Sequence, residues 1–220
     1  MKINQILIKI DESQLFVPAF QREYVWRRKD AKNLISSLIK DYPTGTMLTW
    51  ETNNPPELKG PHKYHPKQGA VKLILDGQQR ITTLYILMTG NIPPYYKEDE
   101  ITYDIKPLYV NVESLDLEYY RKKMMDANPL WVHITDIFKG SVRKRDVVDK
   151  LEQMNDGVRI SKELENVLDD NFHAIETISD RDFKEQEVPT QAEFGRCDID
   201  VNGRITVLDA LLWLERIMGL

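Results

Sequence analysis

The sequence is poor in cysteine, histidine and uninterrupted apolar runs. Its 220 residues include a single cysteine, Cys197, and four histidines. A lone cysteine excludes an internal disulfide, which agrees with a reducing compartment. No apolar run approaches the roughly 20 residues that cross a bilayer, and the N-terminus lacks the long apolar core of a signal peptide. These absences predict a cytoplasmic protein with no membrane contact.

Charge is present in ordinary amount but is unevenly distributed. The hydrophobic fraction is 41% and the charged fraction 30%, as in soluble globular proteins. Residues 1–50 hold eight Lys or Arg and five Asp or Glu, whereas residues 146–220 hold eight and eighteen. A weakly basic front half can meet a polyanion. Three basic clusters are interpreted first as solvated faces: Arg27-Arg28-Lys29, Arg121-Lys122-Lys123 and Arg143-Lys144-Arg145.

The spacing of apolar residues predicts an α+β fold, with a small mixed sheet flanked by helices. Pro18 withholds a ladder donor, so an extended edge or loop is expected around it, at residues 15–26. A loop is expected at residues 53–69. Strands are predicted at residues 3–10 (or the lead-in to one), 46–52, 71–75 and 101–112. Helices are predicted from Asp30, as the cap, to Tyr42, after Gly77 as far as Gly90, over 115–125 and within 130–173.

The domain organisation follows from these elements. We expect one domain over residues 1–178, made of a core at 1–95 and a helical extension at 96–178. The polar stretch 179–196 is expected to be a linker, and 197–220 a separate loop and helix. A chain of 220 residues is long enough for one medium domain plus a small appendage.

The most informative local pattern is a buried strand that turns directly into a helix through Asp-Gly-Gln-Gln-Arg, residues 76–80. Backbone N–H groups and the dipole at a helix N-terminus bind anions, and Gly77 lets the backbone approach a ligand. Arg80 can present a planar fork to two phosphate oxygens. Thr82 and Thr83 place hydroxyls in the first helical turn, where a phosphate would lie.

A second interpretation of this turn needs no ligand. Asp76 could hold a divalent cation, or could simply cap the helix by accepting from its free N–H groups. In the latter case Gly77 only makes the turn, and Gln78, Gln79 and Arg80 are solvated. The turn is not a Walker A loop, so the residues alone leave both interpretations open.

Two sequence blocks together resemble the GmrSD N-terminal family. They are Val-Pro-Ala-Phe-Gln-Arg-Glu-Tyr-Val-Trp at residues 17–26 and Ile-Leu-Asp-Gly-Gln-Gln-Arg-Ile-Thr-Thr-Leu at residues 74–84. The family occurs in modification-dependent restriction and other anti-phage systems, and its fold is similar to ParB and sulfiredoxin. The resemblance is clear over residues 5–90, and it implies a ParB/sulfiredoxin-like fold.

The resemblance also implies a nucleotide-phosphate pocket at the 76–80 turn. It would take a nucleoside triphosphate with Mg²⁺, and several family members hydrolyse the triphosphate. Asp76 and Arg80 are the implied catalytic residues. The implied phosphate-binding residues are Gln21, Arg22, Gly77, Gln78, Gln79, Arg80, Thr82 and Thr83.

The first block would face the same pocket and would add contacts to DNA. Gln21 and Arg22 would contact phosphate or modified DNA. Tyr24 and Trp26 could stack on a base, because aromatic faces accept any base. Both could equally anchor the following helix in the core, and for Trp26 the core is favoured.

The chain departs from the family in one respect. Full-length relatives often carry a second, His-Asn-His-type nuclease domain, whereas the histidines here have neither nuclease nor metal spacing: His62, His65, His133 and His173. Phosphodiester cleavage by this chain alone is therefore not predicted, and a nuclease partner subunit is.

A calcium-type loop is predicted near the C-terminus, at residues 198–209. Its oxygen ligands have the spacing of an EF-hand loop, with Gly203 at the sharp turn. The segment is similar to a single type I dockerin repeat, and the helix after it has an apolar face suited to self-association. A surface turn before a capped helix is the alternative. The Ca²⁺ ligands would be Asp198, Asp200, Asn202, the Arg204 carbonyl, Thr206 and Asp209.

Two functions of different class are compatible with these features. One is a nucleotide- or nucleic-acid-phosphate-binding component of a restriction or anti-phage defence system, with triphosphate hydrolysis coupled to DNA sensing. The other is a non-catalytic DNA-binding or adaptor module with a calcium-dependent C-terminal contact.

Overall fold

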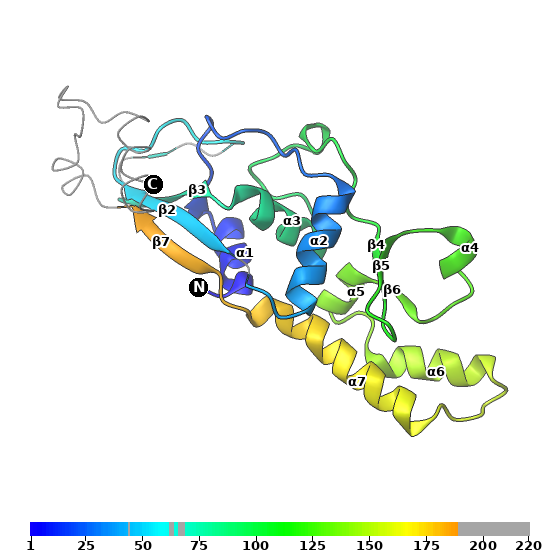
Figure 1. Ribbon diagram of the computed structural model, residues 1–220. Helices are drawn as coiled ribbons and strands as arrows, with labels where there is room; N and C mark the ends of the chain where they lie inside the picture. Colours follow the sequence, from blue (N-terminus) through cyan, green and yellow to red (C-terminus); the bar gives the residue numbers. More distant parts are fainter. Residues whose placement is uncertain (44, 62–63, 66–68, 189–220) are drawn as a thin grey trace, which may run out of the picture.

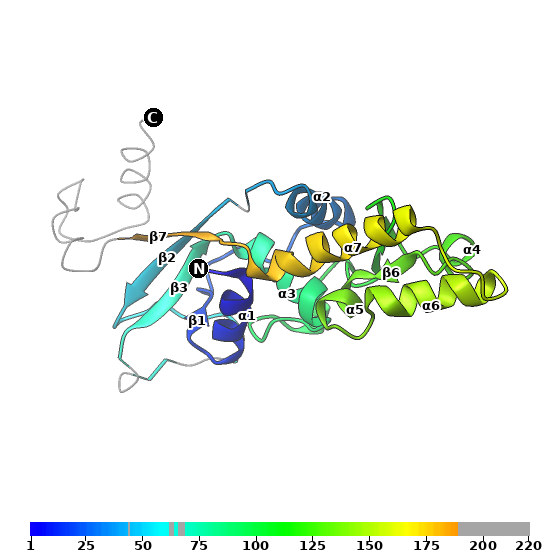
Figure 2. The same ribbon diagram turned by 90° about the horizontal axis from the view of Figure 1, so that it is seen from below.

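The computed structural model describes residues 1–43, 45–61, 64–65 and 69–188. The molecule is elongated, with one sheet and the N-terminus at one end and a pair of helices at the other (Figures 1 and 2). The mixture of small sheets and flanking helices confirms the predicted α+β fold. Among the described helices, none is long and apolar enough to span a membrane.

The N-terminal segment is a helix, α1 (Ile3–Asp11), so the strand predicted at residues 3–10 is wrong. Ile3, Ile6, Leu7 and Ile10 are buried. Their spacing of three and four residues matches one face of an α-helix and not the two-residue alternation of a strand. The backbone N–H of Ile3 donates to the Arg181 carbonyl at 3.0 Å, which holds α1 against the end of the described chain.

The larger sheet has the strand order β1-β3-β2-β7. β2 pairs antiparallel with β3, as suits two strands on either side of a long loop, while β1 pairs in parallel with β3 and β7 with β2. The predictions at 46–52 and 71–75 are confirmed, and Pro18 lies just beyond the short edge strand. The bounds are β1 (Leu15–Phe16), β2 (Thr46–Thr52), β3 (Val71–Asp76) and β7 (Lys184–Val188).

β7 lies within the stretch expected to be a linker, so that expectation is wrong for residues 184–188. The strand sits beside β2 at the sheet edge (Figure 2). Phe183, directly before it, is fully buried, and the N-terminal amine donates to the Phe183 carbonyl at 3.1 Å. Lys72 of β3 donates to Glu185 at 3.0 Å. Because β7 is an edge strand with mostly charged and polar side chains, it has no alternation of apolar residues. The sequence pattern therefore did not indicate a strand there.

Two helices follow in the core: α3 (Gln78–Thr89) continues directly from the turn after β3, and α2 (Arg28–Ile39) packs against α3 and against the strand at residues 117–119. α3 runs through the centre of the core, with buried residues on all of its faces. Asp30 lies in the first turn of α2 and does not cap it, since its carboxylate accepts from the backbone N–H of the N-cap residue Arg27 at 2.9 Å.

The expected helical extension contains a second sheet, in the order β5-β4-β6. The helix predicted at 115–125 is wrong except for its last turn at 122–125, because Leu115 adopts φ +61° and Leu117 then pairs with Val110 of β4. The strand predicted at 101–112 is confined to four residues. The bounds are η2 (Glu98–Glu100), β4 (Leu108–Asn111), β5 (Leu117–Tyr119), the one-turn α4 (Lys122–Met125) and β6 (Trp131–His133).

Helices follow β6, as predicted within 130–173. The Ser161 hydroxyl caps α7 by accepting from the Leu164 N–H at 3.2 Å. Lys144 of α6 pairs with Asp169 of α7 at 2.8 Å, and α7 then returns the chain to the larger sheet (Figure 1). The bounds are α5 (Ile134–Phe138), α6 (Lys144–Met154), α7 (Lys162–Glu176) and η3 (Thr177–Asp180).

Candidate functional site

The turn between β3 and α3 is made by Gly77, which is the N-cap of α3 and has φ +92°. This left-handed conformation favours glycine. The Gly77 carbonyl accepts from Ile81 N at 3.0 Å, while the described residues provide no acceptor for the N–H groups of Gln78 and Gln79. Within the described residues, the Asp76 carboxylate contacts Arg80 Nη2 at 3.4 Å and accepts from no helix N–H group. The interpretation of Asp76 as a cap is therefore wrong, and two helix N–H groups remain to bind an anion.

The two sequence blocks meet at this turn. A pocket of about 130 Å³ is lined by Gln21, Arg22 and Trp26 from the first block and by residues 76–80 from the second. Gln21 Nε2 donates to the Leu75 carbonyl at 2.8 Å, which ties the blocks together across 54 positions of sequence. The expectation that Gln21 and Arg22 lie beside the turn is confirmed.

The size and charge of this pocket favour a phosphate group. Sites for whole small-molecule ligands are usually about 300–1,000 Å³, so a pocket of about 130 Å³ has room for a phosphate and not for a complete nucleotide. The ionisable lining residues are Arg22, Arg80 and Asp76, an excess of one positive charge. Trp26 is half-buried and packs against the hydrophobic core, as favoured from the sequence, and it also lines this pocket.

Arg22 is placed by bonds to its backbone and not to its side chain. Its carbonyl accepts from Lys59 Nζ at 3.2 Å and from the Tyr96 hydroxyl at 3.3 Å. Lys59 is 7% exposed and also pairs with Glu23 at 2.8 Å. Within the described part of the chain, the exposed Arg22 guanidinium has no hydrogen-bond or ion-pair partner. The side chain is therefore available to an anion.

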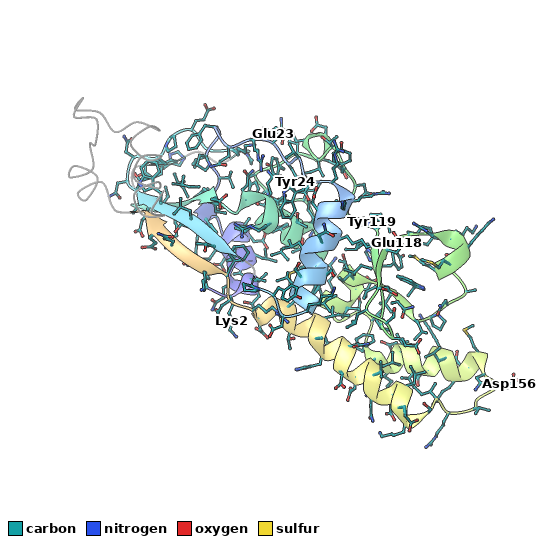
Figure 3. The ribbon with its side chains drawn as sticks, viewed as in Figure 1. Lys2, Glu23, Tyr24, Glu118, Tyr119 and Asp156 are labelled. Atoms are coloured by element: carbon teal, nitrogen blue, oxygen red, sulfur yellow. The ribbon has the colours of Figure 1, made fainter. Side chains whose placement is uncertain are left out.

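The side chain of Gln79 stabilises the loop that carries Arg22. Its Nε2 donates to the Glu23 carbonyl at 3.0 Å, and its Oε1 accepts from the Val25 N–H at 3.0 Å. The side chain is 7% exposed. Gln79 thus satisfies two backbone groups of an irregular loop that passes over α3 (Figure 3). The expectation that its side chain binds phosphate or is solvated is wrong.

Gln78, Thr82 and Thr83 are also directed away from the pocket, into a buried polar layer. Gln78 Nε2 donates to the Tyr96 hydroxyl. The Thr82 hydroxyl lies 3.0 Å from the Tyr95 hydroxyl, and the Thr83 hydroxyl donates to the Gln79 carbonyl at 2.8 Å. Because both threonines are fully buried, the expectation that their hydroxyls contact phosphate is wrong. Of these three residues, only Gln78 remains a candidate ligand, through its backbone N–H.

Tyr24 belongs to this layer as well. It is 1% exposed, and its hydroxyl lies 2.8 Å from the Thr83 hydroxyl. Burial raises the pKa of Tyr24 to about 12, so its phenol stays protonated. Because the Thr83 hydroxyl donates to the Gln79 carbonyl, the Tyr24 hydroxyl donates to Thr83. A ring without an accessible face cannot stack on a base. The base-stacking expectation for Tyr24 is therefore wrong, and Trp26 is the aromatic residue at the pocket.

Arg80 is held at the other side of the pocket. Its Nη2 donates to the Thr46 carbonyl at 2.6 Å and lies 3.4 Å from the Asp76 carboxylate. The guanidinium also lies over the Phe183 ring, 5.3 Å from its centroid. Its side chain is 22% exposed. These contacts orient the guanidinium at the pocket edge, beside Gly45.

A metal ion would have one protein ligand here. The Asp76 carboxylate is 74% exposed and lines the pocket. Mg²⁺ in phosphate sites is commonly held by one or two carboxylates together with phosphate oxygens and water. Among the described residues there is no cluster of three metal-ligating side chains. Asp76 therefore fits a Mg²⁺ ion that enters with a phosphate ligand. The calcium-type loop at 198–209 lies outside the described residues.

Sequence reasoning missed Lys59, Tyr95 and Tyr96. All three are buried. Lys59 and Tyr96 contact the loop that carries Arg22, and Tyr95 contacts Thr82 of α3. Lys59 lies in a stretch rich in proline and glycine, where no periodicity indicates burial. The adjacent tyrosines after Pro93-Pro94 were the available signal, because buried tyrosine needs a hydrogen-bond partner and α3 offers several polar side chains.

Comparison with known proteins agrees with this geometry. The family described as "GmrSD restriction endonuclease, N-terminal domain" matches residues 3–196, and the chain belongs to this family. The match includes β7 and the second sheet. A curated relative, an uncharacterized protein of Methanocaldococcus jannaschii, is 39% identical over 95 residues. The alignment covers 39% of this chain and 16% of the relative, so the chain corresponds to a small part of that longer protein.

Proposed function

We propose that the pocket between the Gln21-Arg22 loop and the 76–80 turn binds a phosphate of a nucleoside triphosphate. The observation that carries the proposal is the convergence of two N–H groups at the start of α3 with the Arg22 guanidinium, which has no partner in the part of the chain that the structure describes. Helix N-terminal donors and arginine forks are the groups that proteins use for phosphate. The small volume places sugar and base outside the pocket, where the half-buried Trp26 offers an aromatic surface.

The same arrangement supports hydrolysis of the bound triphosphate. Phosphoryl transfer depends on positioning and on charge stabilisation more than on covalent chemistry. Asp76 would hold Mg²⁺, which supplies positive charge to the phosphate oxygens. Arg80, fixed by the Thr46 carbonyl and Phe183, would stabilise charge on the opposite side. Release of inorganic phosphate from a nucleoside triphosphate, with and without Mg²⁺, tests this step.

Replacing Arg22 with Ala should weaken triphosphate binding about 10- to 150-fold, since charge-assisted hydrogen bonds contribute roughly 1.5–3 kcal/mol. Isothermal titration calorimetry measures the change. Arg159→Ala is the matched control, because Arg159 is likewise exposed but lies in the loop after α6. Equal affinities of the Arg22 variant and the wild type would overturn the assignment of Arg22.

We further propose that the chain acts in the cytoplasm as the nucleotide-binding component of a restriction or anti-phage defence system. Membership of the family supports this role, and the absence of a nuclease motif in the sequence supports a nuclease partner. The bound triphosphate would be coupled to DNA. The test is whether a triphosphate changes the affinity of the purified chain for DNA, because a purely adaptor-like module would show no such coupling.

The sequence 198–209 supports a second, calcium-dependent function of the C-terminal segment. Ca²⁺ should bind this loop, because its three carboxylates repel one another without a cation. Asp198→Ala should abolish the binding, because it removes the first ligand of the loop. Calorimetric titration of Ca²⁺ measures this, and sedimentation with and without Ca²⁺ tests self-association. An identical response of wild type and variant would contradict a calcium site.

A further inference from the structure

The β5-β4-β6 sheet carries aromatic side chains on its outer face. In the register between β4 and β6, Tyr109 pairs with His133 and Asn111 with Trp131. Because side chains alternate along a strand, these four lie on one face of the sheet, and all are half-exposed. The ring centroids of Tyr109 and His133 are 5.2 Å apart. The residues that alternate with them along the two strands are buried: Leu108, Val110 and Val132.

Three residues of this face, Tyr109, Trp131 and His133, line a second pocket, together with residues 125–129 and residues of α6. Its volume is about 580 Å³, against about 130 Å³ for the phosphate pocket. Tyr109 and Trp131 line it together with the apolar side chains of Met125, Val147 and Met154. The volume lies within the range of sites for planar organic ligands.

Charge decides which part of a nucleotide this pocket admits. Asp126 and Asp136 line it, against one lysine, Lys150. Asp136 lies 3.5 Å from His133 Nδ1. Burial raises the pKa of Tyr109, and the nearby carboxylates of Asp136 and Asp126 raise it further. Carboxylates repel phosphate, so an uncharged ring is admitted and phosphate is not.

Two cationic residues lie on the helix that leads into the pocket wall. Lys122 and Lys123 are exposed on α4, which leads directly into the pocket wall at Met125. In the part of the chain that the structure describes, neither lysine has an acidic partner. A strand whose base entered the pocket would therefore meet positive charge where its flanking phosphates continue.

We propose that this aromatic pocket takes up an unstacked base of single-stranded DNA. The base lies against Tyr109 and Trp131, and the flanking phosphates lie toward Lys122 and Lys123. Exposed aromatic residues on a sheet face, with basic residues beside them, are a common platform for stacking single-stranded nucleic acid. This site is separate from the phosphate pocket and does not depend on its function.

The experiment measures binding of a labelled single-stranded DNA of about 12 nucleotides by fluorescence anisotropy, using the whole chain. Trp131→Ala should weaken binding about 5- to 150-fold, the effect of losing one stack of a base on an aromatic ring. Trp131→Phe keeps an aromatic face and should restore most of the affinity. Tyr42→Ala is the control, because Tyr42 is 59% exposed but lies outside the pocket.

Two further measurements separate base from phosphate. An oligonucleotide of the same length without bases should bind weakly to the wild type and equally weakly to Trp131→Ala. The double variant Lys122→Ala/Lys123→Ala should weaken binding and reduce its dependence on salt, because fewer counterions are released. This variant changes only exposed side chains, so it tests the surface even if Trp131→Ala fails to fold. Wild-type affinity of Trp131→Ala or of the double variant, or equal binding of the base-free strand, would overturn the proposal.

Discussion

Replacing Gln79 with Glu will make the stability of the protein depend on pH in the acid range. Gln79 donates to the Glu23 carbonyl and accepts from the Val25 N–H. A protonated carboxyl group can make both bonds. An ionised carboxylate cannot donate, and it would lie buried against the Glu23 carbonyl. We expect a loss of roughly 3 kcal/mol in the free energy of unfolding at pH 7, typical of an uncompensated buried charge.

The sign follows from proton linkage. Burial and the facing carbonyl raise the pKa of the introduced carboxyl group in the folded state above its unfolded value of about 4.3. The folded variant therefore binds the proton more tightly than the unfolded chain does. The loss in the free energy of unfolding, relative to wild type, is small below about pH 4. It grows as the pH rises from the unfolded-state pKa to the folded-state pKa of the introduced carboxyl group, and it is constant above that. Denaturant titrations between about pH 4 and pH 8 measure the difference.

Gln153→Glu is the matched control, because Gln153 is an exposed residue of α6 and its stability difference should not vary with pH. The Gln79 variant should also bind triphosphate more weakly at pH 7 than wild type, since Gln79 holds the chain on either side of Tyr24, next to Arg22. A stability difference independent of pH would rule out this role of Gln79.

Replacing Gly45 with Ala should lower both stability and triphosphate affinity. Gly45 has φ +87°, where a non-glycine residue costs about 1–3 kcal/mol. A Cβ at this position would lie 1.9 Å from Arg80 Nη1 and 3.2 Å from Cζ. The guanidinium would have to leave the Thr46 carbonyl and the Phe183 ring. Denaturant titration and calorimetry measure the two effects, and we expect roughly a tenfold loss of affinity for one misplaced charged group.

Gly157→Ala is the control that separates backbone strain from displacement of the Arg80 guanidinium. Gly157 has a similar φ of +80°, and a Cβ there would meet none of the described atoms within 4 Å. It should lose stability through backbone strain alone and keep its affinity for triphosphate. If both alanine variants bind triphosphate as wild type does, Arg80 does not need its present position to bind the ligand.

Local sequence was sufficient for the central strand–turn–helix element. Val71–Asp76 and Gln78–Thr89 form the predicted strand and helix. A dense apolar run ends at Asp76, and Gly77 then adopts the left-handed conformation that favours glycine. It was insufficient at both ends of the described chain. α1 was mistaken for a strand although its buried isoleucines follow the helical period. β7 has no apolar alternation, and its charged side chains find their partners, such as Lys72, more than 100 positions away.

By itself, the sequence determined the family, the α+β class and the pairing of two distant blocks around one turn. It also determined the chemistry available there: a glycine, two arginines and a carboxylate. Only the tertiary structure decided which side chains face the pocket. α3 is covered on every side, so helical periodicity could not separate an exposed face from a buried one. Gln79, Thr82 and Thr83 therefore hold the loop and the core together, while the Arg22 guanidinium has no partner among the described residues, which bond only to its backbone.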